Sequence, residues 1–368
     1  MKRVVVLHFN PLELYPPVQN LLAEMSKSEG HKTFVVSTRS GKQNVELAQF
    51  HETKIFRFGL SGKYLNKAVR YATYVYYNVF ATLLLAFLRP SKLIYFESLS
   101  SYPAYVYKKY INRNAKIFIH YHEYTSIEEY AKGMITTQYF HRLEKKLYPE
   151  VAWLSHTNDV RMQLFLEDIA PLKVSSTHIL PNYPPLSWNS VRKNGKNTPL
   201  RLIYVGSLGM KSMFVKEFTK WVVGLNGKVI WDIYSINGDN DVLEYFDAFR
   251  SPNINFKAGV SYEELPAILR QYDVGVILYN GHIPNYVHVA PNKLFEYLAC
   301  GLDVWFPNVI KGTLQYISLD CSPKVVPLDF NNLEEIDLVD LKRQPNRKCP
   351  NNYFAEVALK PLLERLKD

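Results

Sequence analysis

The stretch HVAPNKLFEYLACGLDVWFP, residues 288–307, decides how the rest of the chain is interpreted. Its order is that of a loop, a short helix, a glycine stop and a strand. Pro291 suits the first position of a helix, where a missing N–H costs nothing. Gly301 suits the position just past the helix end, where a positive φ is needed. The predicted buried face consists of residues at helical spacing: Leu294, Tyr297 and Leu298.

Another stripe of this predicted helix carries an amide, a cation and a carboxylate: Asn292, Lys293 and Glu296. The N-terminal end of a helix has partial positive charge and free N–H groups, so it suits a phosphate. Glu296 could accept hydrogen bonds from paired ribose hydroxyls, as acidic residues do in other doubly wound nucleotide sites. The alternative is an amphipathic helix with a solvated polar face. The position of the motif between two hydrophobic strands, 273–279 and 304–306, favours the binding site.

The stretch resembles a motif of the GT-B glycosyltransferases of glycosyltransferase family 4, P-x-K-x-x-E-Y-x-A-x-G-x-P-V. The matching residues are Pro291, Lys293, Glu296, Tyr297, Ala299, Gly301 and Val304. The resemblance implies that Glu296 binds the ribose of a nucleotide-sugar donor, with Asn292 and Lys293 beside it. His288 stands where many members have a second glutamate, which changes how the donor's phosphate or sugar is held; we keep it among the donor-binding residues. Asp303 stands where proline is usual, which changes only the turn.

Composition limits the class of protein. A chain of 368 residues favours two domains, and a hydrophobic fraction of 47% is enough for an ample core, which argues against disorder. The net charge of +10 indicates an anionic partner, either nucleic acid, anionic lipid or a phosphate-bearing substrate, unless this is simply a basic soluble enzyme. The cysteines, Cys300, Cys321 and Cys349, form no C-x-x-C pair. We therefore expect no disulfide framework, no zinc site and a reducing compartment.

Two apolar segments bear on location. The N-terminal run in MKRVVVLHFNP is too short for a secretory signal and reads better as a strand. Residues 71–88, YATYVYYNVFATLLLAFL, approach the length of a membrane span, but Tyr, Thr and Asn interrupt them. We expect a helix that is buried or lies at an interface rather than one that spans a bilayer. The predicted location is cytoplasmic, with peripheral contact at the inner face of an anionic membrane.

The first half of the chain alternates strands and helices, which predicts a parallel doubly wound sheet. Strands are expected at 3–9, 33–37, 55–58, 92–96, 115–120 and 152–155, and helices at 18–26, 71–88 and 102–111. Ligands of such sheets bind at the carboxyl ends of the strands. We assign the residues after the first and fourth strands, Asn10, Glu13 and Glu97, to the acceptor side. The first loop has no glycine, so the dinucleotide fingerprint G-x-G-x-x-G is absent there.

The loop after the strand at 115–120 holds His122 and Glu123. Many members of the family carry a histidine–glutamate pair here, facing the interdomain cleft, so the resemblance implies a catalytic role for both. His122 could orient or polarise the sugar, or it could be structural. His120, His122 and Glu123 could also be metal ligands. We expect no metal site, because no third convincing ligand is nearby in the sequence.

The second half begins after residues 184–199, which are rich in Pro, Ser, Asn and Lys and read as a linker. A strand at 202–205 leads into the turn 206–211 and a helix at 212–223, a layout that lets backbone N–H groups approach a phosphate. In the family this turn contacts the donor diphosphate, and a second glycine loop lies beside the base. The residues thereby implied in donor binding are Gly206, Ser207, Lys211, Gly259 and Val260.

The predicted fold is α/β of the GT-B type, with two doubly wound Rossmann-like domains facing across a cleft and a C-terminal helix crossing back. We predict an acceptor-binding domain at 1–186, a linker at 187–199, a nucleotide-sugar-binding domain at 200–350, and a helix at 351–368 that packs on the first domain.

The implied function is transfer of a sugar, with retention, from a nucleotide-diphosphate sugar to a lipid-linked or oligosaccharide acceptor in surface polysaccharide biosynthesis. The leaving group is an anion, and helix N-termini, backbone N–H groups and Lys211 or Lys293 can offset its charge, so we expect no metal and no cofactor. Two alternatives stay open: a non-catalytic partner subunit that binds sugar nucleotides, and an epimerase of the same fold. A nucleic-acid-binding protein is a third, but its basic residues should be gathered in one stripe, and here they are scattered.

Overall fold

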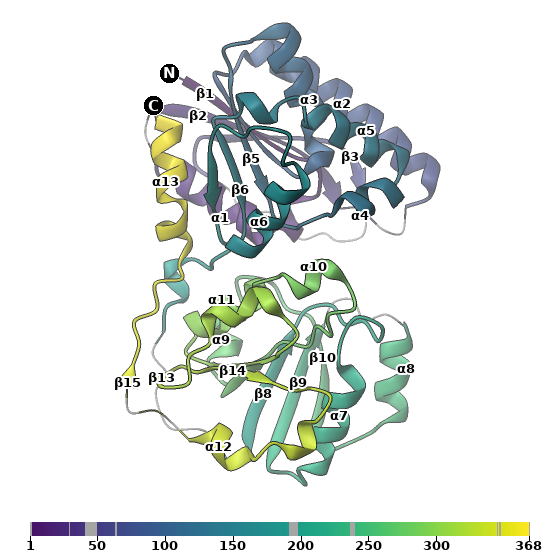
Figure 1. Ribbon diagram of the computed structural model, residues 1–368, viewed down its shortest axis with the longest axis vertical. Helices are drawn as coiled ribbons and strands as arrows, with labels where there is room; N and C mark the ends of the chain where they lie inside the picture. Colours follow the sequence, from purple (N-terminus) through teal and green to yellow (C-terminus); the bar gives the residue numbers. More distant parts are fainter. Residues whose placement is uncertain are drawn as a thin grey trace. The chain divides into compact units, whose positions relative to one another are not determined.

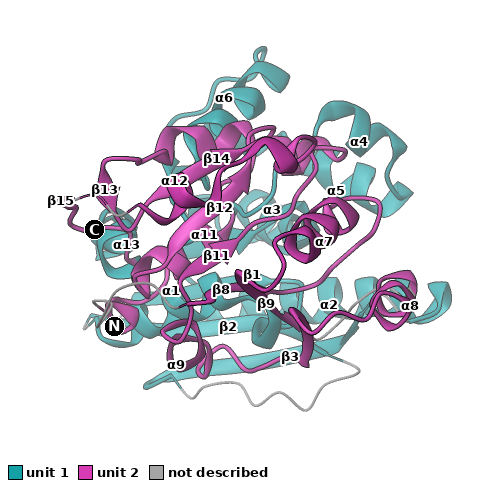
Figure 2. Ribbon diagram, turned by 90° about the horizontal axis from the view of Figure 1, so that it is seen from below, with its two compact units in different colours: residues 1–182, 355–368 teal, residues 183–354 magenta. Residues whose placement is uncertain are grey.

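The structure is a computed structural model that describes every residue except 1, 29, 41–49, 63, 64, 191–197, 236–239, 344, 346 and 368. The chain forms two compact units, Met1–Asn182 together with Ala355–Asp368, and Tyr183–Phe354 (Figures 1 and 2). Each unit is described by itself below. Residues 191–197 of the predicted linker lie outside the described residues.

The first unit contains a sheet of seven strands in the order β3-β2-β1-β4-β5-β6-β7, all of them paired in parallel. The strands are β1 Lys2–His8, β2 His31–Ser40, β3 Thr53–Ser61, β4 Lys92–Phe96, β5 Lys116–Tyr121, β6 Trp153–His156 and β7 Thr177–Ile179. Strand order runs outward in both directions from the pair β1 and β4, so the switch point of this sheet lies between them. A ligand is expected where the carboxyl ends of these two strands separate.

Helices cover both faces of this sheet (Figure 1). They are α1 Pro16–Ser26, α2 Lys67–Leu88, α3 Ser101–Val106, α4 Ile127–Lys132, α5 Ile135–Glu144, α6 Asp159–Asp168 and α13 Ala355–Lys367, with short turns at Leu12–Leu14, Ser98–Ser100, Tyr107–Ile111 and Tyr148–Glu150. The C-terminal helix α13 packs beside α1, where Leu359 and Leu362 join the same buried cluster as Val18 and Leu22. The helix predicted to return to the first domain therefore does so.

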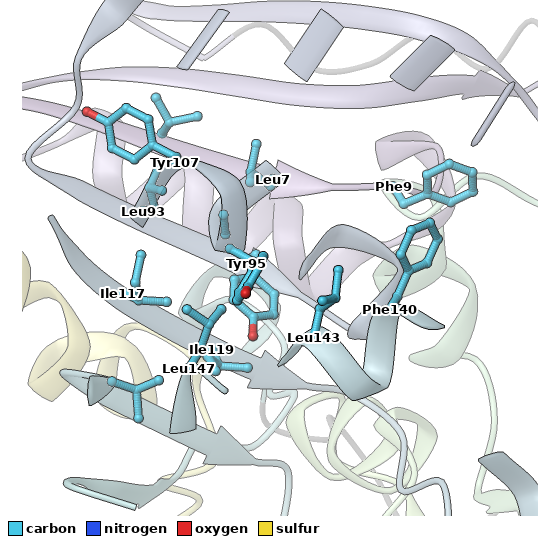
Figure 3. Close-up of a cluster of buried hydrophobic side chains, with 14 of the residues drawn as sticks. Leu7, Phe9, Leu93, Tyr95, Tyr107, Ile117, Ile119, Phe140, Leu143 and Leu147 are labelled. Carbon is cyan, nitrogen blue, oxygen red and sulfur yellow. The ribbon is translucent and has the colours of Figure 1, made fainter. Parts of the chain in front are cut away.

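The core on the opposite face of the sheet is shown in Figure 3. Its members come from the central strands and from α2, α3 and α5, and include Leu7, Leu93, Tyr95, Ile119 and Phe140. These strands are buried on both faces, which is why they read as nearly continuous apolar runs rather than as alternating ones. The predicted strands at 3–9, 92–96 and 115–120 were recognisable for that reason.

The second unit contains a parallel sheet of six strands in the order β10-β9-β8-β11-β12-β14. The strands are β8 Leu200–Val205, β9 Val229–Ser235, β10 Ile254–Ala258, β11 Val274–Val276, β12 Asp303–Pro307 and β14 Val325–Leu328. The helices are α7 Val215–Gly224, α8 Asn240–Ala248, α9 Leu265–Leu269, α10 Pro284–Val287, α11 Asn292–Ala299 and α12 Leu338–Lys342, with short turns at Leu186–Trp188, Lys311–Tyr316 and Leu333–Glu335. Here the switch point lies between β8 and β11.

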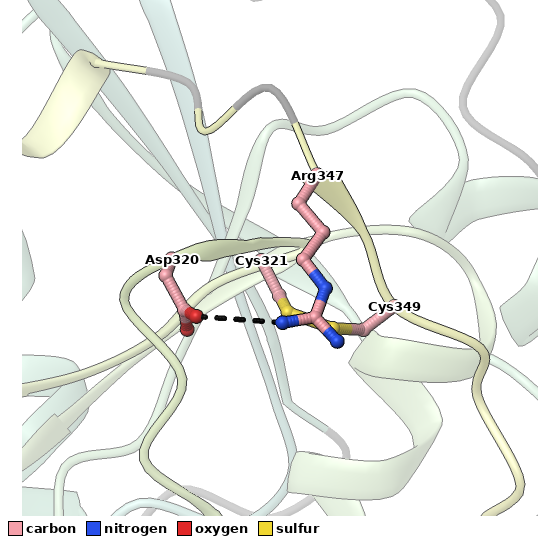
Figure 4. The surroundings of a disulfide bond; sticks show 4 residues. All are labelled: Asp320, Cys321, Arg347 and Cys349. Atoms are coloured by element: carbon pink, nitrogen blue, oxygen red, sulfur yellow. Dashed lines mark ion pairs between the residues drawn. A yellow bond between two sulfur atoms is a disulfide. The ribbon is translucent and has the colours of Figure 1, made fainter.

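One expectation about the cysteines is wrong. Cys321 and Cys349 form a disulfide between β13 (Cys321–Ser322) and the residue that directly follows β15 (Arg347–Lys348), close to the ion pair between Asp320 and Arg347 (Figure 4). The two cysteines are 28 residues apart, and only the pairing of β13 with β15 brings them together. Cys300 is free and buried.

The helix expected over 71–88 begins at Lys67 and becomes α2. Among the described residues it is the one helix long and apolar enough to cross a membrane by length and composition, with a mean hydropathy of 1.4. It packs against β3 and α3 of the first unit, and seven of its residues are buried.

Candidate functional site

The switch point of the second sheet brings together two parts of the predicted donor site. Gly206 directly follows β8 with φ of 131°, a conformation that favours glycine. A Cβ at this position would lie 2.9 Å from both Cε and Nζ of Lys293, which is in the first turn of α11. The lysine side chain thus lies directly over the glycine backbone. Glycine is required here for two reasons, its positive φ and the close approach of this cation.

The ammonium group of Lys293 lies among aromatic rings. Its Nζ is 5.6 Å from the centroid of the Tyr204 ring and 6.0 Å from that of Tyr279. Tyr204 is the second-last residue of β8 and Tyr279 follows β11, so the two rings come from both sides of the switch point. Within the described part of the chain no carboxylate forms an ion pair with Lys293. A cation held by ring faces, with no carboxylate at ion-pair distance among the described residues, is available to an anionic ligand.

Glu296 follows Lys293 by three residues, so it lies on the same side of α11. Burial raises the pKa of its carboxyl to about 7, although the nearby positive charge of Lys293 lowers it. No described donor forms a hydrogen bond with this carboxylate. Glu296 is half-buried, and a carboxyl that loses water without gaining a hydrogen-bond partner is unfavourable. A ligand that brings two hydroxyl donors, such as a ribose, would do so.

A contact with the sheet, which the sequence did not indicate, fixes the position of α11. A Cβ on Gly275 of β11 would lie 2.0 Å from the ring of Tyr297, so glycine lets α11 pack directly on the sheet. The Tyr297 hydroxyl accepts a hydrogen bond of 3.3 Å from the N–H of Val205, which precedes Gly206. The helix ends at Ala299, and Gly301 lies just past its end, as predicted, with φ of 78°. Its start differs by one residue, because Pro291 occupies the capping position and the helix begins at Asn292.

The turn 206–211 is held by hydrogen bonds to its surroundings. The Tyr204 hydroxyl donates to the carbonyl of Ser207 at 2.7 Å, and the Asn280 amide donates to the carbonyl of Lys211 at 3.0 Å. The side chains of Ser207 and Lys211 are exposed. The predicted helix after this turn begins three residues later than expected, at Val215. Of the two lysines proposed for the diphosphate, Lys293 is therefore the one that lies against Gly206.

The remaining predicted donor residues lie on neighbouring segments. Gly259 and Val260 follow the end of β10 and are half-buried. His288 ends the short helix α10, and its backbone carbonyl would be 2.3 Å from a Cβ on Gly312, which fixes the segment that leads into α11. Asn292 is the first residue of α11 and is also half-buried. Their roles toward a donor stay predictions.

The switch point of the first sheet brings together a different group of residues. His8 ends β1, Glu97 follows β4, and His122 follows β5. The ring centroids of His8 and His122 are 6.4 Å apart, and the ring of Phe96 stacks on His122 at 5.1 Å. His8 was not singled out from the sequence, where it stands inside a run of strand residues.

Both histidines are buried and neutral at pH 7. Burial and the charge of His122 lower the pKa of His8 to about 3, and burial lowers the pKa of His122 to about 4. His8 donates from Nδ1 to the carbonyl of Asn10 at 2.7 Å, and His122 donates from Nδ1 to Oδ1 of Asn182 at 3.2 Å. Each ring therefore keeps a lone pair on Nε2, and neither Nε2 has a partner among the described residues. A lone pair of this kind accepts a hydrogen bond from a hydroxyl.

Glu97 holds the loop that carries His122. Its Oε1 accepts the backbone N–H of His122 at 2.7 Å and that of Glu123 at 3.2 Å. Its own φ is 61°, in a region that residues other than glycine rarely adopt. Burial and the charge of Glu123 raise the pKa of its carboxyl to about 8. Glu97 was predicted on the acceptor side; the structure shows that its carboxylate is directed at the backbone of the His122 loop.

Arg161 supports the same loop from α6. Its Nη1 donates to the carbonyl of His122 at 2.6 Å and to the hydroxyl of Thr157 at 3.0 Å. Asn158 caps this helix by accepting the N–H of Arg161 at 2.8 Å. The backbone of His122 is thus held on both sides, by Glu97 at its N–H and by Arg161 at its carbonyl.

The other predicted residues of the first unit differ in their surroundings. Glu13 forms an ion pair of 2.8 Å with Arg57 and accepts the N–H of Ser40, so it is engaged within the protein. Asn10 donates to the Tyr15 hydroxyl at 2.9 Å. The side chain of Glu123 is exposed. Of the predicted residues, only His122 lies at the centre of the histidine cluster.

A small recess opens beside this cluster in the first unit. It is lined by Glu123, Tyr130, His141, His156 and Asp168, among others. His156 is buried, and neither ring nitrogen has a hydrogen-bond partner among the described residues. Metal binding is a separate question: no group of three or more His, Cys, Asp or Glu side chains in the described residues is placed to hold an ion.

Comparison with known proteins gives similarity of structure alone. No protein-family model matches the sequence, and no curated protein matches it either. Sucrose-phosphate synthase from Thermosynechococcus elongatus is similar with a TM-score of 0.68 and 12% identity, over 100% of this chain and 94% of that one. The apo form of the lipopolysaccharide outer core galactosyltransferase WaaB gives 0.63 and 11%, over 99% of each chain. The UDP-GlcNAc 2-epimerase from Methanocaldococcus jannaschii gives 0.60 and 9%, over 100% of this chain and 99% of that one.

These similarities extend over nearly the whole of each chain and include both sheets. The fold is therefore GT-B, with two Rossmann-like domains built on parallel sheets, as the sequence predicted. At such low identity the comparison establishes the fold. The activity has to be argued from the residues.

Proposed function

We propose that the protein is a glycosyltransferase that uses a nucleotide-diphosphate sugar as donor. The observation that carries this proposal is the arrangement at the β8/β11 switch point, where the Lys293 ammonium lies against Gly206 and Glu296 is one turn further along α11. A cation over a glycine backbone suits a diphosphate, and an unsatisfied carboxyl beside it suits the hydroxyls of a ribose. Structural neighbours that are glycosyltransferases support the same assignment.

The chemical step breaks the bond between the anomeric carbon and the diphosphate oxygen, and the electrons of that bond leave with the diphosphate. The acceptor's hydroxyl oxygen forms the new bond to the anomeric carbon and releases its proton. The developing negative charge lies where Lys293 and the backbone around Gly206 are placed, so these groups stabilise the transition state more than the ground state. We propose that they replace a metal ion in this role and that no cofactor takes part.

We assign His122 to the sugar or to the acceptor hydroxyl. Since its pKa is about 4, the ring is neutral at pH 7 and Nε2 accepts a hydrogen bond rather than donating one. The contacts of Glu97 and Arg161 with the backbone on either side keep this acceptor in place. Retention of the anomeric configuration and membership of glycosyltransferase family 4 rest on the motif at 291–304. We also propose that the acceptor is a lipid-linked sugar or an oligosaccharide and that the reaction belongs to surface polysaccharide assembly.

An epimerase is the second candidate, because several UDP-GlcNAc 2-epimerases have the same fold. The two functions give different products from one incubation. A transferase forms a glycosylated acceptor and a nucleoside diphosphate, or a free sugar if water takes the place of the acceptor. With no acceptor present, an epimerase gives an isomerised nucleotide sugar, or a free sugar whose configuration is inverted at the epimerised carbon.

The test is a panel of nucleotide sugars incubated with the purified protein, with and without an acceptor mixture. Release of nucleoside diphosphate by the wild-type protein, and its loss in Glu296→Ala, supports the proposal. A thermal-shift screen finds the preferred base first, because a ligand at 100 times its Kd adds about 2.7 kcal/mol to the free energy of unfolding. If no nucleoside diphosphate stabilises the protein and no nucleotide sugar is consumed, the proposal is wrong. Addition of a chelator tests the role given to Lys293, and it should leave turnover unchanged.

A further inference from the structure

From Tyr71 to Leu88, every exposed residue of α2 is apolar or aromatic. Its exposed large residues are all apolar or aromatic: Val69, Tyr71, Val75, Tyr76, Val79, Phe80, Leu83 and Phe87. Five of them recur every four residues, from Tyr71 to Phe87, and form one stripe along the helix. Between Arg70 and Arg89 the helix carries no charged side chain. A helix on the surface of a protein normally has a polar face opposite its buried one, and none of the described residues covers this apolar face.

The inward side of α2 is fully engaged in the first unit. Tyr77 is buried against Phe9, at 5.0 Å between ring centroids, and the Thr73 hydroxyl donates to the carbonyl of Leu60 at 2.9 Å. A Cβ on Gly59 would lie 2.8 Å from Thr73, so β3 and α2 pack in close contact. Crossing a bilayer would require this helix to leave the core. We therefore infer that α2 stays packed in the first unit and that a partner binds to its outer face.

The apolar surface extends beyond the helix. Phe58 of the edge strand β3 lies against Phe80, at 5.5 Å between ring centroids. At the other side, Arg70 contacts the sulfur of Met134 at 3.6 Å, and Met134 precedes Ile135, which is 77% exposed. We call the exposed side of α2 together with Phe58, Met134 and Ile135 the α2 face.

The charge of this region identifies the partner. The charged residues on α2 and at its two ends are all basic: Lys67, Arg70 and Arg89. Lys67 and Arg70 flank the stripe at the start of α2, and Arg89 flanks it at the end. An apolar stripe with basic residues at both ends and with tyrosines near its start is the pattern of a helix that lies in the interface of an anionic bilayer.

We propose that the α2 face docks flat on an anionic lipid membrane. The side chains of the stripe enter the headgroup region, and Lys67, Arg70 and Arg89 lie near the lipid phosphates. This inference goes beyond the transfer reaction proposed above and stands on the outer face of α2 alone, so either can fail without the other.

Flotation with vesicles tests the docking. Vesicles of phosphatidylcholine alone are compared with vesicles that also contain phosphatidylglycerol, at low and high salt. We expect the wild-type protein to float with the anionic vesicles, and high salt to release part of it, because exposed charges are screened. Leu83→Ser combined with Phe87→Ser should weaken binding about tenfold or more. Leu83 and Phe87 are 59% and 81% exposed, so the fold should persist, and thermal unfolding verifies that it does.

The matched control replaces Val339 and Val357 by serine. These valines are 71% and 59% exposed, on α12 and α13, and their replacement should leave flotation unchanged. If the first double variant unfolds, Val75→Ser with Val79→Ser tests the same stripe one and two turns earlier.

The inference is overturned if the wild-type protein does not bind anionic vesicles, or if it binds equally after the stripe is replaced. It is also overturned if the wild-type protein is a dimer in solution that the stripe variant converts to a monomer, because a second copy would then cover the α2 face. Consumption of nucleotide sugar is measured in parallel without vesicles, so that loss of docking and loss of transfer are told apart.

Discussion

The carboxyl edges of the two sheets use different chemistry to present polar groups. In the first unit, ionisable side chains at this edge form hydrogen bonds with the backbone of a neighbouring residue, as Glu97 and Arg161 do with the backbone of His122. In the second unit the edge is made of a glycine, a lysine among aromatic rings and a carboxyl without a described partner, Gly206, Lys293 and Glu296.

This difference indicates a division of labour. In the first edge, the groups that satisfy one another hold the His122 backbone and so fix the position of its unpartnered Nε2. In the second edge, the groups left unsatisfied are the ones that attract a ligand. We therefore expect changes in the first edge to lower turnover and changes in the second edge to lower affinity for the donor. The predictions below test that separation, beginning with the largest effect.

His122→Ala should have the largest effect on turnover. Removal of the Nε2 acceptor should lower kcat about 10²–10⁴-fold if the ring positions or polarises a reacting group. Affinity for a nucleoside diphosphate, measured by calorimetry, should change little, because the residue belongs to the other unit. His51→Ala replaces an exposed histidine of the same unit and serves as the control. An unchanged kcat would make His122 structural, and a parallel loss of affinity would contradict the division of labour.

Lys293→Ala should lower the rate of transfer about 10²–10³-fold, the usual effect of removing one group that stabilises a leaving anion. Lys211→Ala is the matched comparison, because Lys211 is the other lysine predicted to bind the diphosphate and its side chain is exposed. We expect a smaller effect from it. Gly206→Ala should resemble Lys293→Ala, since its Cβ would lie 2.9 Å from the ammonium nitrogen. If Lys211→Ala is the more damaging variant, the diphosphate lies on the turn and not beside α11.

Glu296→Ala should weaken binding of a nucleoside diphosphate about ten- to hundredfold, because hydrogen bonds to a charged acceptor are lost. Binding of inorganic pyrophosphate should be unaffected, whereas Lys293→Ala should weaken both ligands. This contrast separates recognition of the ribose from recognition of the phosphates within a single helix. Glu263→Ala removes an exposed glutamate of the same unit and should change neither affinity. Equal binding of the nucleoside diphosphate by Glu296→Ala and wild type would refute the ribose assignment.

The pH dependence of donor binding gives a second measure of Glu296. Its pKa of about 7 means that the carboxyl is largely protonated at pH 6 and largely ionised at pH 8. The ionised form accepts both ribose hydroxyls, so affinity should rise across this interval. Glu296→Gln should flatten the curve. An identical pH profile in both proteins would assign the titration to another group.

The fold could be predicted because its signals are local. Buried parallel strands read as apolar runs, and the segment at 288–307 combined a helix, a glycine stop and a strand that all formed where expected, within one residue at Pro291. The lysine and the glutamate of α11 were found because they share one helical stripe. These features depend on residues a few positions apart.

What the sequence did not show depends on contacts between distant segments. Gly275 is not part of a turn motif. Glycine is required there because the Tyr297 ring, 22 residues later in the chain, packs against its backbone. His8, His122 and Asn182 meet only once β1, β5 and the chain after β7 are in place. The disulfide of Cys321 with Cys349 was missed for the same reason. The ion pair of Glu13 with Arg57 is another contact between distant segments that the sequence did not indicate.

The smallest effect expected is on stability, and it concerns the glutamate that holds the His122 loop. Burial raises the pKa of Glu97 from 4.5 to about 8, so between these values the folded protein keeps a proton that the unfolded chain releases. Folding stability therefore falls as pH rises through this interval. Glu97→Gln removes the titration and retains an oxygen that can accept an N–H. The variant should gain about 1–3 kcal/mol relative to wild type between pH 5 and pH 8, measured by urea unfolding. If the unfolding free energies of the two proteins remain parallel over this range, the carboxyl of Glu97 is not protonated in the folded protein, and it accepts the two N–H groups of the His122 loop as a carboxylate.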